Sequence, residues 1–172
     1  MIEVLRLSHR LRRDVRLSSH IGLTSRAFLV DKLYYSGDHD SSLEESISDI
    51  VSRFGGSFSI SYVKNPVSFV KNKKKEGYLI VHLTVYGMGI KKKINKLKNK
   101  KILIVIGSEH VPPVYYELAD YNVSITSQPI SELSALTVFL HELLEGKELD
   151  SKFEDAKVKI VPSERGKKVS KN

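Results

Sequence analysis

Residues 103–116 read LIVIGSEHVPPVYY, and this stretch decides the fold class. It starts as a continuously apolar run, which is typical of a strand buried on both faces of a parallel sheet. The run changes at once into glycine, serine, an acid and a histidine, and two prolines follow. We therefore expect a buried strand that ends in a tight loop, and a helix that begins at Pro112 or Pro113.

Outward from this stretch, strand-like and helix-like segments alternate along the chain. Apolar or alternating residues predict strands at 2–7, 32–37, 57–63, 78–87, 101–107 and 121–125. Helical spacing predicts helices within 18–30, over 40–54 and over 131–145, and short ones after Asn65 and within 90–97. The alternation predicts an α/β fold in which helices flank a mostly parallel sheet. We expect a single domain over residues 1–172, with a last strand and then a basic C-terminal tail from about residue 162.

Two of the predicted helices carry capping signals. Ser41 and Glu44 have the spacing of a capping box, in which two side chains satisfy free backbone amides of the first turn. Ser18 or Ser19 is predicted to cap the first helix, because a serine oxygen accepts hydrogen bonds from such amides.

The composition excludes several classes of protein. The chain has 172 residues, no cysteine and a formal net charge of +8. A domain of this size buries a sufficient core without a metal or a disulfide. The absence of cysteine excludes disulfides, thiolate zinc sites and cysteine nucleophiles, and it agrees with a cytoplasmic location. No apolar run approaches the roughly 18 to 20 residues that a membrane-spanning helix needs, so a soluble protein is expected.

The positive charge is clustered in three segments, at 6–16, 71–75 and 91–101. The first cluster consists of arginines, whose planar fork suits phosphate. Contact with phosphate is therefore favoured for these clusters, and the alternative is a set of solvated basic faces.

Three predicted strands end in loops with little charge. These loops are LTVYGMG at 83–89, VIGSEHVPP at 105–113 and ITSQPISEL at 125–133. Because ligands collect at the carboxyl ends of parallel strands, the loops offer backbone groups to a neutral, flat moiety such as adenine. Ordinary turn chemistry is the alternative for any single loop.

Other kinds of site are disfavoured. The first strand leads into LSHRLRRD at 7–14, which lacks the glycines of a Rossmann motif, and no phosphate-binding P-loop occurs. The six histidines lack metal-ligand spacing, so no metal is predicted. A serine hydrolase is disfavoured because no nucleophile elbow of the G-x-S-x-G kind is present.

Several motifs in one order resemble a known family. They are EVLRLSHRLRRDVRLSSH at 3–20, SRAF at 25–28, HLTVYG at 82–87, GSEHVP at 107–112, YELADYNV at 116–123, SQPISELSAL at 127–136 and PSERGKKV at 162–169. The chain resembles the archaeal tRNA (cytidine-56) 2'-O-methyltransferases of the SPOUT superfamily over nearly its whole length. It departs from the family at Ser8 and Ser19, which replace a glycine and a threonine, and at Leu29 and Val30, which occupy a usually glycine-containing turn.

The resemblance implies a SPOUT-type fold with a deep C-terminal trefoil knot, a homodimer, a tRNA substrate and S-adenosylmethionine as methyl donor. It implies that the cofactor binds to Leu83, Thr84, Gly87, Gly107, Ser108, Glu109, His110, Val111, Ile125, Thr126, Ser127, Gln128, Pro129, Ile130, Ser131 and Glu132. Backbone contacts with RNA are expected from Arg10, Arg12, Arg13, Arg16, Lys91, Lys92 and Lys93. Ser131 is equally expected to cap the last helix.

Two residues are predicted to be catalytic from the same resemblance. His20 and Arg26 have the six-residue spacing of a motif in related 2'-O-methyltransferases, where an asparagine stands in place of the histidine. Since a guanidinium stays protonated, we expect Arg26 to clamp a phosphate and orient the hydroxyl more than to act as a base. A salt bridge on the helix is the structural alternative for Arg26.

Two rival functions stay open at this point. A SPOUT base methyltransferase would use an acidic base near the cofactor, and Glu109 and Glu132 are available for that role. A basic RNA-binding domain without catalytic activity would explain the charge but not the three uncharged loops.

Overall fold

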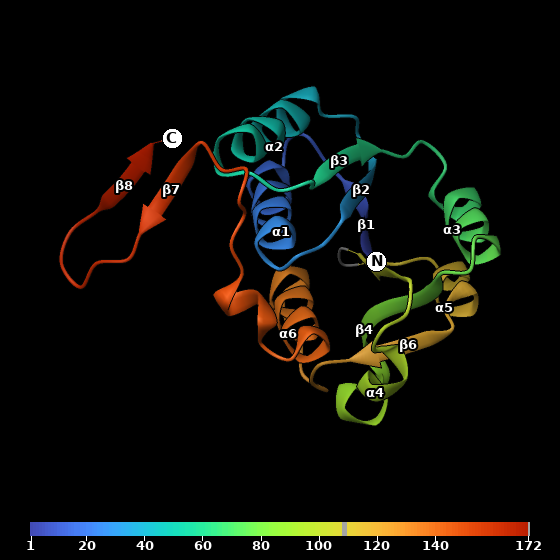
Figure 1. Cartoon of the computed structure of the whole chain (residues 1–172). Coiled ribbons are helices and arrows are strands. Elements are labelled where there is room, and N and C mark those ends of the chain that lie inside the picture. Colours follow the sequence, from blue (N-terminus) through green and yellow to red (C-terminus); the bar gives the residue numbers. More distant parts are fainter. Residues whose placement is uncertain (108–109, 172) are drawn as a thin grey trace.

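A computed structural model describes residues 1–107 and 110–171. Six parallel strands form one sheet in the order β3-β2-β1-β5-β4-β6 (Figure 1). The strands are β1 (Ile2–His9), β2 (Lys32–Gly37), β3 (Ser59–Tyr62), β4 (Leu79–Gly89), β5 (Ile102–Ile106) and β6 (Tyr121–Ser124). The predicted α/β fold with a parallel sheet is confirmed.

Helices cover both faces of the sheet. They are α1 (Val15–Ala27), α2 (Ser41–Phe54), α3 (Pro66–Lys75), α4 (Ile94–Leu97), α5 (Pro113–Leu118) and α6 (Glu132–Leu144), with 3-10 turns η1 (Ile90–Lys92) and η2 (Lys147–Asp150). The core on one face includes residues of α1, α2, α4 and α6, and the core on the other includes residues of α3 and α5. The result is a three-layer arrangement with β1 and β5 at its centre.

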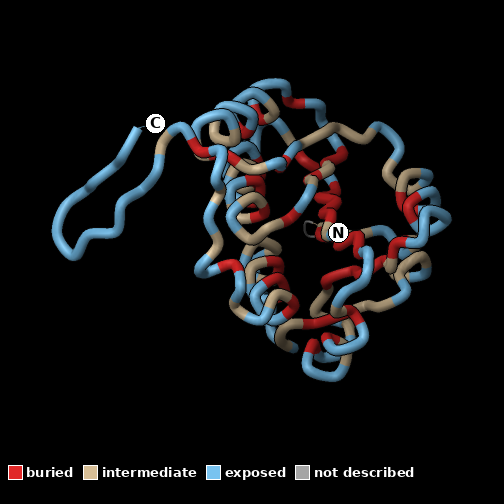
Figure 2. Tube along the Cα trace, in the orientation of Figure 1, coloured by how far each residue is buried: buried red, intermediate tan, exposed pale blue. Residues whose placement is uncertain are grey.

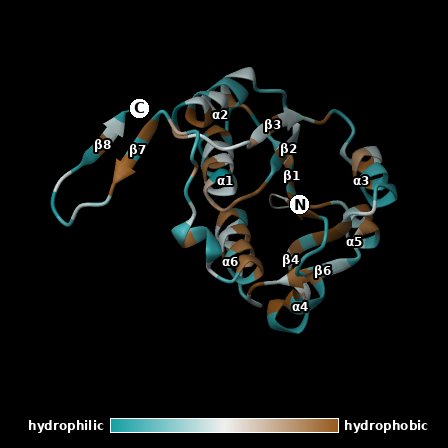
Figure 3. Cartoon of the chain, in the orientation of Figure 1, coloured by the Kyte–Doolittle hydropathy of each residue, from teal (hydrophilic) through white to brown (hydrophobic). Residues whose placement is uncertain are grey.

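Strand β5, the apolar run of the sequence, lies in the middle of this three-layer arrangement. Every residue of β5 is buried (Figure 2). Ile102, Ile104 and Ile106 belong to the core on the α1 and α6 side, whereas Leu103 and Val105 belong to the opposite core. Because successive side chains of a strand point to opposite faces, covering both faces requires the continuous apolar run seen in the sequence. Figure 3 shows the same hydrophobic character in the central strands.

The structure corrects the capping predictions for two helices. Helix α1 begins at Val15 with Asp14 at its N-cap, so Ser18 and Ser19 lie inside the helix. The N-cap of α2 is Asp40, whose carboxylate accepts a hydrogen bond from the backbone amide of Leu43.

A tertiary contact explains the shift at α2. Asp40 is buried and its second carboxylate oxygen lies 3.2 Å from His9 Nε2, so this contact fixes the residue at the start of the helix in place of the neighbouring Ser41.

The C-terminal segment, where a last strand and a basic tail were expected, forms two strands. Strands β7 (Val158–Val161) and β8 (Lys168–Lys171) pair antiparallel as a hairpin that extends away from the main body (Figure 1). Its residues are almost all exposed (Figure 2). The basic residues of this segment therefore lie on a projecting two-stranded arm.

Among the helices in the described part of the chain, none is long and apolar enough to cross a membrane.

Candidate functional site

The carboxyl ends of the parallel strands open into a cavity, at the edge of the sheet where ligands collect in such folds. Its volume is about 690 Å³. One wall consists of residues 82–86 of β4 and the ends of β5 and β6 with the loops that follow them, and the other of Arg6 on β1, the loop between β1 and α1 and the first turn of α6. The predicted loop at 83–89 is wrong, because these residues belong to β4. The predicted cofactor-binding residues that line the cavity are Leu83, Thr84, Gly107, Val111, Ile125, Thr126, Pro129, Ile130, Ser131 and Glu132.

The remaining predicted cofactor residues have other positions. Gly87, His110, Ser127 and Gln128 belong to the same segments but are not among the residues that line the cavity. Ser108 and Glu109 lie outside the described residues.

Two glycines allow neighbouring segments to approach closely. A Cβ at Gly87 would stand 2.5 Å from the backbone nitrogen of Val123, so glycine lets the last part of β4 lie against the backbone of β6. A Cβ at Gly107 would collide with the Val111 side chain, which also lines the cavity. Gly107 thus leaves space between the end of β5 and Val111 within the cavity, which suits a flat ligand.

His82 is a lining residue that the sequence analysis missed. Its Nδ1 lies 2.9 Å from Asn122 Oδ1, and the Asn122 amide donates to the carbonyl of Tyr116 at 2.9 Å. The Asn122 oxygen is therefore the acceptor, Nδ1 carries the hydrogen, and Nε2 is a bare acceptor. Burial lowers the pKa of His82, although the bond to Asn122 opposes this shift. His82 Nε2 is buried and has no hydrogen-bond partner among the described residues.

A buried arginine belongs to the other wall of the cavity. Arg6 is 0% exposed although it lies within strand β1. Its Nε and Nη2 donate to Glu132 Oε1 at 3.1 and 2.9 Å. Glu132 Oε2 is buried and lacks a hydrogen-bond partner among the described residues. An arginine in an apolar strand is the signal that could have identified Arg6, because such residues are almost never buried without a partner.

Asp14 completes the charged wall and was also missed. Arg10 Nε and Nη2 donate to its two carboxylate oxygens at 2.9 and 3.3 Å, and Arg6 Nη2 lies 3.7 Å away. Burial alone would raise the pKa of Asp14, but the hydrogen bond from Arg10 and the charge of Arg6 hold it below the usual value. Both oxygens of Asp14 therefore serve to hold the arginines.

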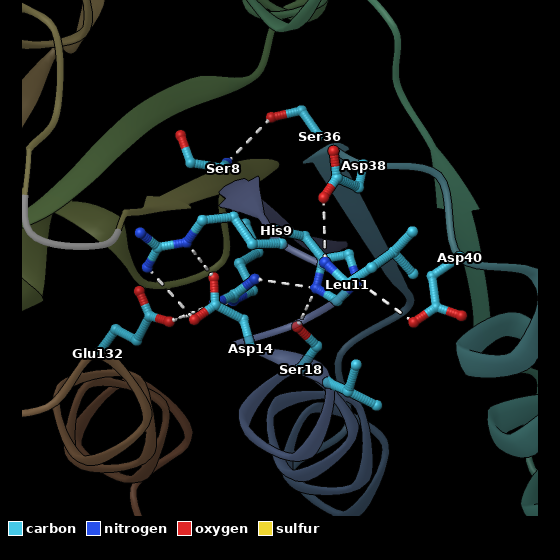
Figure 4. A network of polar contacts seen from close by, with 12 residues as sticks. Ser8, His9, Leu11, Asp14, Ser18, Ser36, Asp38, Asp40 and Glu132 are labelled. Carbon is cyan, nitrogen blue, oxygen red and sulfur yellow. Dashed lines mark hydrogen bonds and ion pairs between the residues drawn. The ribbon is translucent and has the colours of Figure 1, made fainter.

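His9 links this wall to the body of the protein (Figure 4). Its Nδ1 lies 2.7 Å from Ser18 Oγ and its Nε2 lies 3.2 Å from Asp40 Oδ2. The order Ser, His, Asp matches a hydrolase triad, but none of the three residues lines the cavity and Ser18 is 1% exposed. Arg6 Nη1 lies 3.4 Å from His9 Nδ1, so the group supports Arg6.

The two predicted catalytic residues lie elsewhere in the chain. Arg26 donates to the backbone carbonyls of Phe54 and Gly55, where α2 ends, and its guanidinium lies 4.4 Å from the ring centre of Phe153. His20 is exposed on α1. Neither residue is among those that line the cavity, so a single chain does not bring them to it.

The predicted RNA-binding residues fall into two groups. Arg10 and Arg13 line the cavity, and Arg12 and Arg16 are exposed beside it in the sequence. Lys91, Lys92 and Lys93 lie at η1 and do not line the cavity. The arginine loop is thus the cationic surface that adjoins the cavity directly.

No group of three or more potential metal-ligating side chains occurs in the described ranges 1–107 and 110–171.

Comparison with solved structures shows the same fold in RNA-modifying enzymes. The A. aeolicus TrmH/SpoU tRNA modifying enzyme is 19% identical with a TM-score of 0.62, covering 86% of this chain and 76% of that one. The SpoU methyltransferase AviRb from Streptomyces viridochromogenes, in complex with AdoMet, is 16% identical with a TM-score of 0.61, covering 88% and 59% of the two chains. At this identity the likeness shows the fold alone.

Comparison of sequences shows the family as well as the fold. The model of the family described as "tRNA ribose 2'-O-methyltransferase, aTrm56" matches residues 54–170. Relatives named tRNA (cytidine(56)-2'-O)-methyltransferase include those of Methanopyrus kandleri, 47% identical over 98% of this chain and 95% of that protein, and Thermococcus kodakarensis, 47% identical over 98% and 96%. With this identity over nearly the full length, the chain belongs to the aTrm56 family of tRNA ribose 2'-O-methyltransferases.

Proposed function

We propose that the chain transfers a methyl group from S-adenosylmethionine to the ribose 2'-hydroxyl of cytidine-56 in tRNA. The observation that carries this proposal is the composition of the cavity, which joins the uncharged ends of three strands, with the loops after β5 and β6, to the arginines between β1 and α1. The names of the relatives support the choice of nucleotide.

The loop side of the cavity fits the cofactor. The slot beside Gly107 and the backbone of 125–131 would hold the flat adenine and the ribose. The bare Nε2 of His82 would accept a hydrogen bond from a hydroxyl or amino group, which its buried environment requires. S-adenosylmethionine, when bound, supplies the electrophilic methyl group of its sulfonium.

The arginine side fits RNA. Arg10 and Arg13 line the cavity, so they would bind phosphates next to the nucleotide that enters it. A base held in a folded loop must leave its stack before its ribose reaches such a cavity, so opening of the tRNA loop belongs to the reaction.

Three features of the family enter the proposal. The final strands would tie a trefoil knot, supported by the order β5-β4-β6, in which the last strand passes beyond β4. Two copies would form a homodimer in the cytoplasm. The predicted roles of Arg26 and His20 would then require the cavity of the second subunit, because neither residue lines the cavity of its own chain.

The experiment is methylation of an unmodified tRNA transcript with labelled S-adenosylmethionine, followed by alkaline hydrolysis. Methylation of the 2'-hydroxyl makes the linkage after nucleotide 56 resistant to alkali, and a transcript with 2'-deoxycytidine at position 56 is the matched control. A labelled base would indicate a base methyltransferase. Tight RNA binding without any transfer would indicate an RNA-binding domain.

A further inference from the structure

Two carboxylates line the arginine wall of the cavity, and they differ in one respect. Asp14 accepts hydrogen bonds on both oxygens from Arg10. Glu132 accepts two hydrogen bonds from Arg6, both on Oε1, and its Oε2 has no partner in the described part of the chain. Its side chain is only 8% exposed. A buried carboxylate oxygen without a donor is costly, so a donor on a bound molecule is expected there.

The position of Glu132 indicates which donor that is. It is the first residue of α6 and the last of the predicted cofactor-binding residues at 125–132. Its ion pair with Arg6 brings it beside the β1–α1 loop, which carries the arginines. Glu132 therefore lies where the cofactor wall and the RNA wall meet. In a transfer between the two ligands, the attacking hydroxyl must lie at that boundary.

We propose that Glu132 Oε2 accepts the proton of the ribose 2'-hydroxyl, and this inference rests on the proposed function. The O–H bond breaks as its proton moves to Oε2. The hydroxyl oxygen forms the new O–CH3 bond, and the electron pair of the broken S–CH3 bond stays on sulfur. The neutral carboxylic acid then releases its proton to water, which restores the starting state.

The neighbouring acceptors do not fit this role. Both oxygens of Asp14 are occupied by Arg10. His82 has a bare Nε2, but its side chain is held by Asn122 on β6 and Tyr116 on α5, whereas Glu132 is held by Arg6. Arg6 acts as a positioning residue, because its two bonds to Oε1 leave Oε2 alone to face a substrate.

The first test is Glu132→Gln. Glutamine keeps the size and an oxygen that accepts from Arg6, but it lacks a basic carboxylate. Since general bases contribute typically about 10²–10⁴-fold, we expect the single-turnover rate to fall at least about 100-fold. Affinity for S-adenosylmethionine, measured by calorimetry without RNA, and affinity for tRNA should stay within about twofold. Glu142→Gln, an exposed position on the same helix, is the matched control and should behave as wild type.

The second test separates a proton acceptor from a simple partner for Arg6. In Glu132→Ala, added formate restores a small basic carboxylate, whereas nitrate restores a planar anion of similar shape that is a negligible base. Formate should raise the single-turnover rate of Glu132→Ala at least about tenfold, and nitrate should leave it unchanged. If the glutamine variant does not fold, the comparison of formate with nitrate in Glu132→Ala still distinguishes a proton acceptor from a partner for Arg6.

Several outcomes would overturn the inference. A wild-type rate in Glu132→Gln, equal rescue by formate and nitrate, or rescue by neither would remove the proton-accepting role. Loss of cofactor affinity in Glu132→Gln would assign Oε2 to the cofactor. A wild-type enzyme that methylates no ribose would instead refute the proposed function, which keeps the two failures distinct.

Discussion

Strand β1 carries two buried ion pairs, one near each end, and they have different consequences. Near its start, Glu3 Oε2 lies 2.6 Å from Lys73 Nζ, and the hydroxyl of Tyr78 donates to Glu3 Oε1 at 3.0 Å. Near its end, Arg6 binds Glu132 Oε1. Glu3 Oε2 and Glu132 Oε2 both lack a hydrogen-bond partner among the described residues, but Glu3 Oε2 has the ion pair with Lys73. The first pair is closed by its surroundings and the second opens on the cavity.

The surroundings make the difference. Lys73 Nζ lies 4.5 Å from the ring centre of Tyr78 and 5.3 Å from that of Tyr34, so aromatic rings cover the pair. Burial alone would lower the pKa of Lys73, but its contacts with Glu3 raise it well above the usual value. Burial and the neighbouring Glu3 raise the pKa of Tyr78 to about 12. Two buried ion pairs on one strand thus stabilise the fold at one end and leave an acceptor for a ligand at the other.

The largest expected effect comes from removing one cation of each pair. Arg6→Met leaves Glu132 and Asp14 without this partner, and we expect the free energy of unfolding to fall by about 3–5 kcal/mol and methylation to be lost. Lys73→Met leaves the buried Glu3 with the Tyr78 hydroxyl as its remaining partner, and should also cost about 3–5 kcal/mol, but with methylation retained. Urea denaturation and single-turnover rates measure both. Loss of methylation in a folded Lys73→Met variant would show that the pair of Glu3 and Lys73 also supports catalysis.

A branched side chain in the slot should nearly abolish cofactor binding. In Gly107→Val, the new side chain meets Val111 and occupies the cavity. We expect affinity for S-adenosylmethionine to fall at least about 100-fold, which corresponds to about 2.8 kcal/mol. Gly89→Val is the control, because a Cβ at Gly89 meets no atom within 4 Å. Equal cofactor affinity in both variants, measured by calorimetry, would place the cofactor outside this cavity.

Charge reversal compares the surfaces at the two ends of β1. Arg12→Glu with Arg13→Glu changes the loop at the open end, and Lys71→Glu with Lys75→Glu makes an equal change of charge on α3 at the closed end. We expect the arginine pair to weaken tRNA binding about tenfold at low salt, with a smaller difference at high salt. The lysine pair should change it less. Equal losses in filter-binding titrations across salt concentrations would show that only total charge matters.

Arg26 offers a smaller effect on stability and a test of its predicted catalytic role. Since its side chain donates to the carbonyls that end α2, Arg26→Ala should lower the free energy of unfolding by about 1–3 kcal/mol. Lysine at this position keeps the charge but lacks the planar fork, so Arg26→Lys should recover only part of the loss. Single-turnover rates in the folded variants, with saturating tRNA and cofactor, address the chemistry. Wild-type rates in Arg26→Ala would leave Arg26 with its structural contacts alone.

The smallest expected effect concerns pH. The pKa of His82 is lowered in the folded protein, so the unfolded chain binds the extra proton first as the solution is acidified. Stability from this residue is present above the ordinary pKa of about 6.5 and is lost as pH falls below it, by at most about 1.4 kcal/mol at pH 5.5. His82→Gln should lose stability at every pH but show less decline between pH 7.5 and 5.5. Parallel thermal unfolding curves for both proteins would contradict this assignment.

Local patterns in the sequence determined most of the fold. The apolar run at 102–106 and the leucine spacing of 132–144 report burial directly, because the hydrophobic effect acts on each residue according to the face it presents. The lining segments after β5 and β6 were predicted for the same reason, since each follows a recognisable strand, whereas the predicted loop at 83–89 is the end of β4. The assignment of these loops to a cofactor came from the resemblance of several motifs to one family.

Only the tertiary structure decided the other wall. Arg6 and Glu132 are separated by 126 positions, and Asp40 caps α2 while bonded to His9 from another strand. The order of strands in the sheet brings such residues together, and no local spacing encodes that order. The sequence showed a chain with strong helix and strand signals and clustered charge. Which buried charge is satisfied, and which keeps an oxygen for a ligand, depends on neighbours that only the folded sheet supplies.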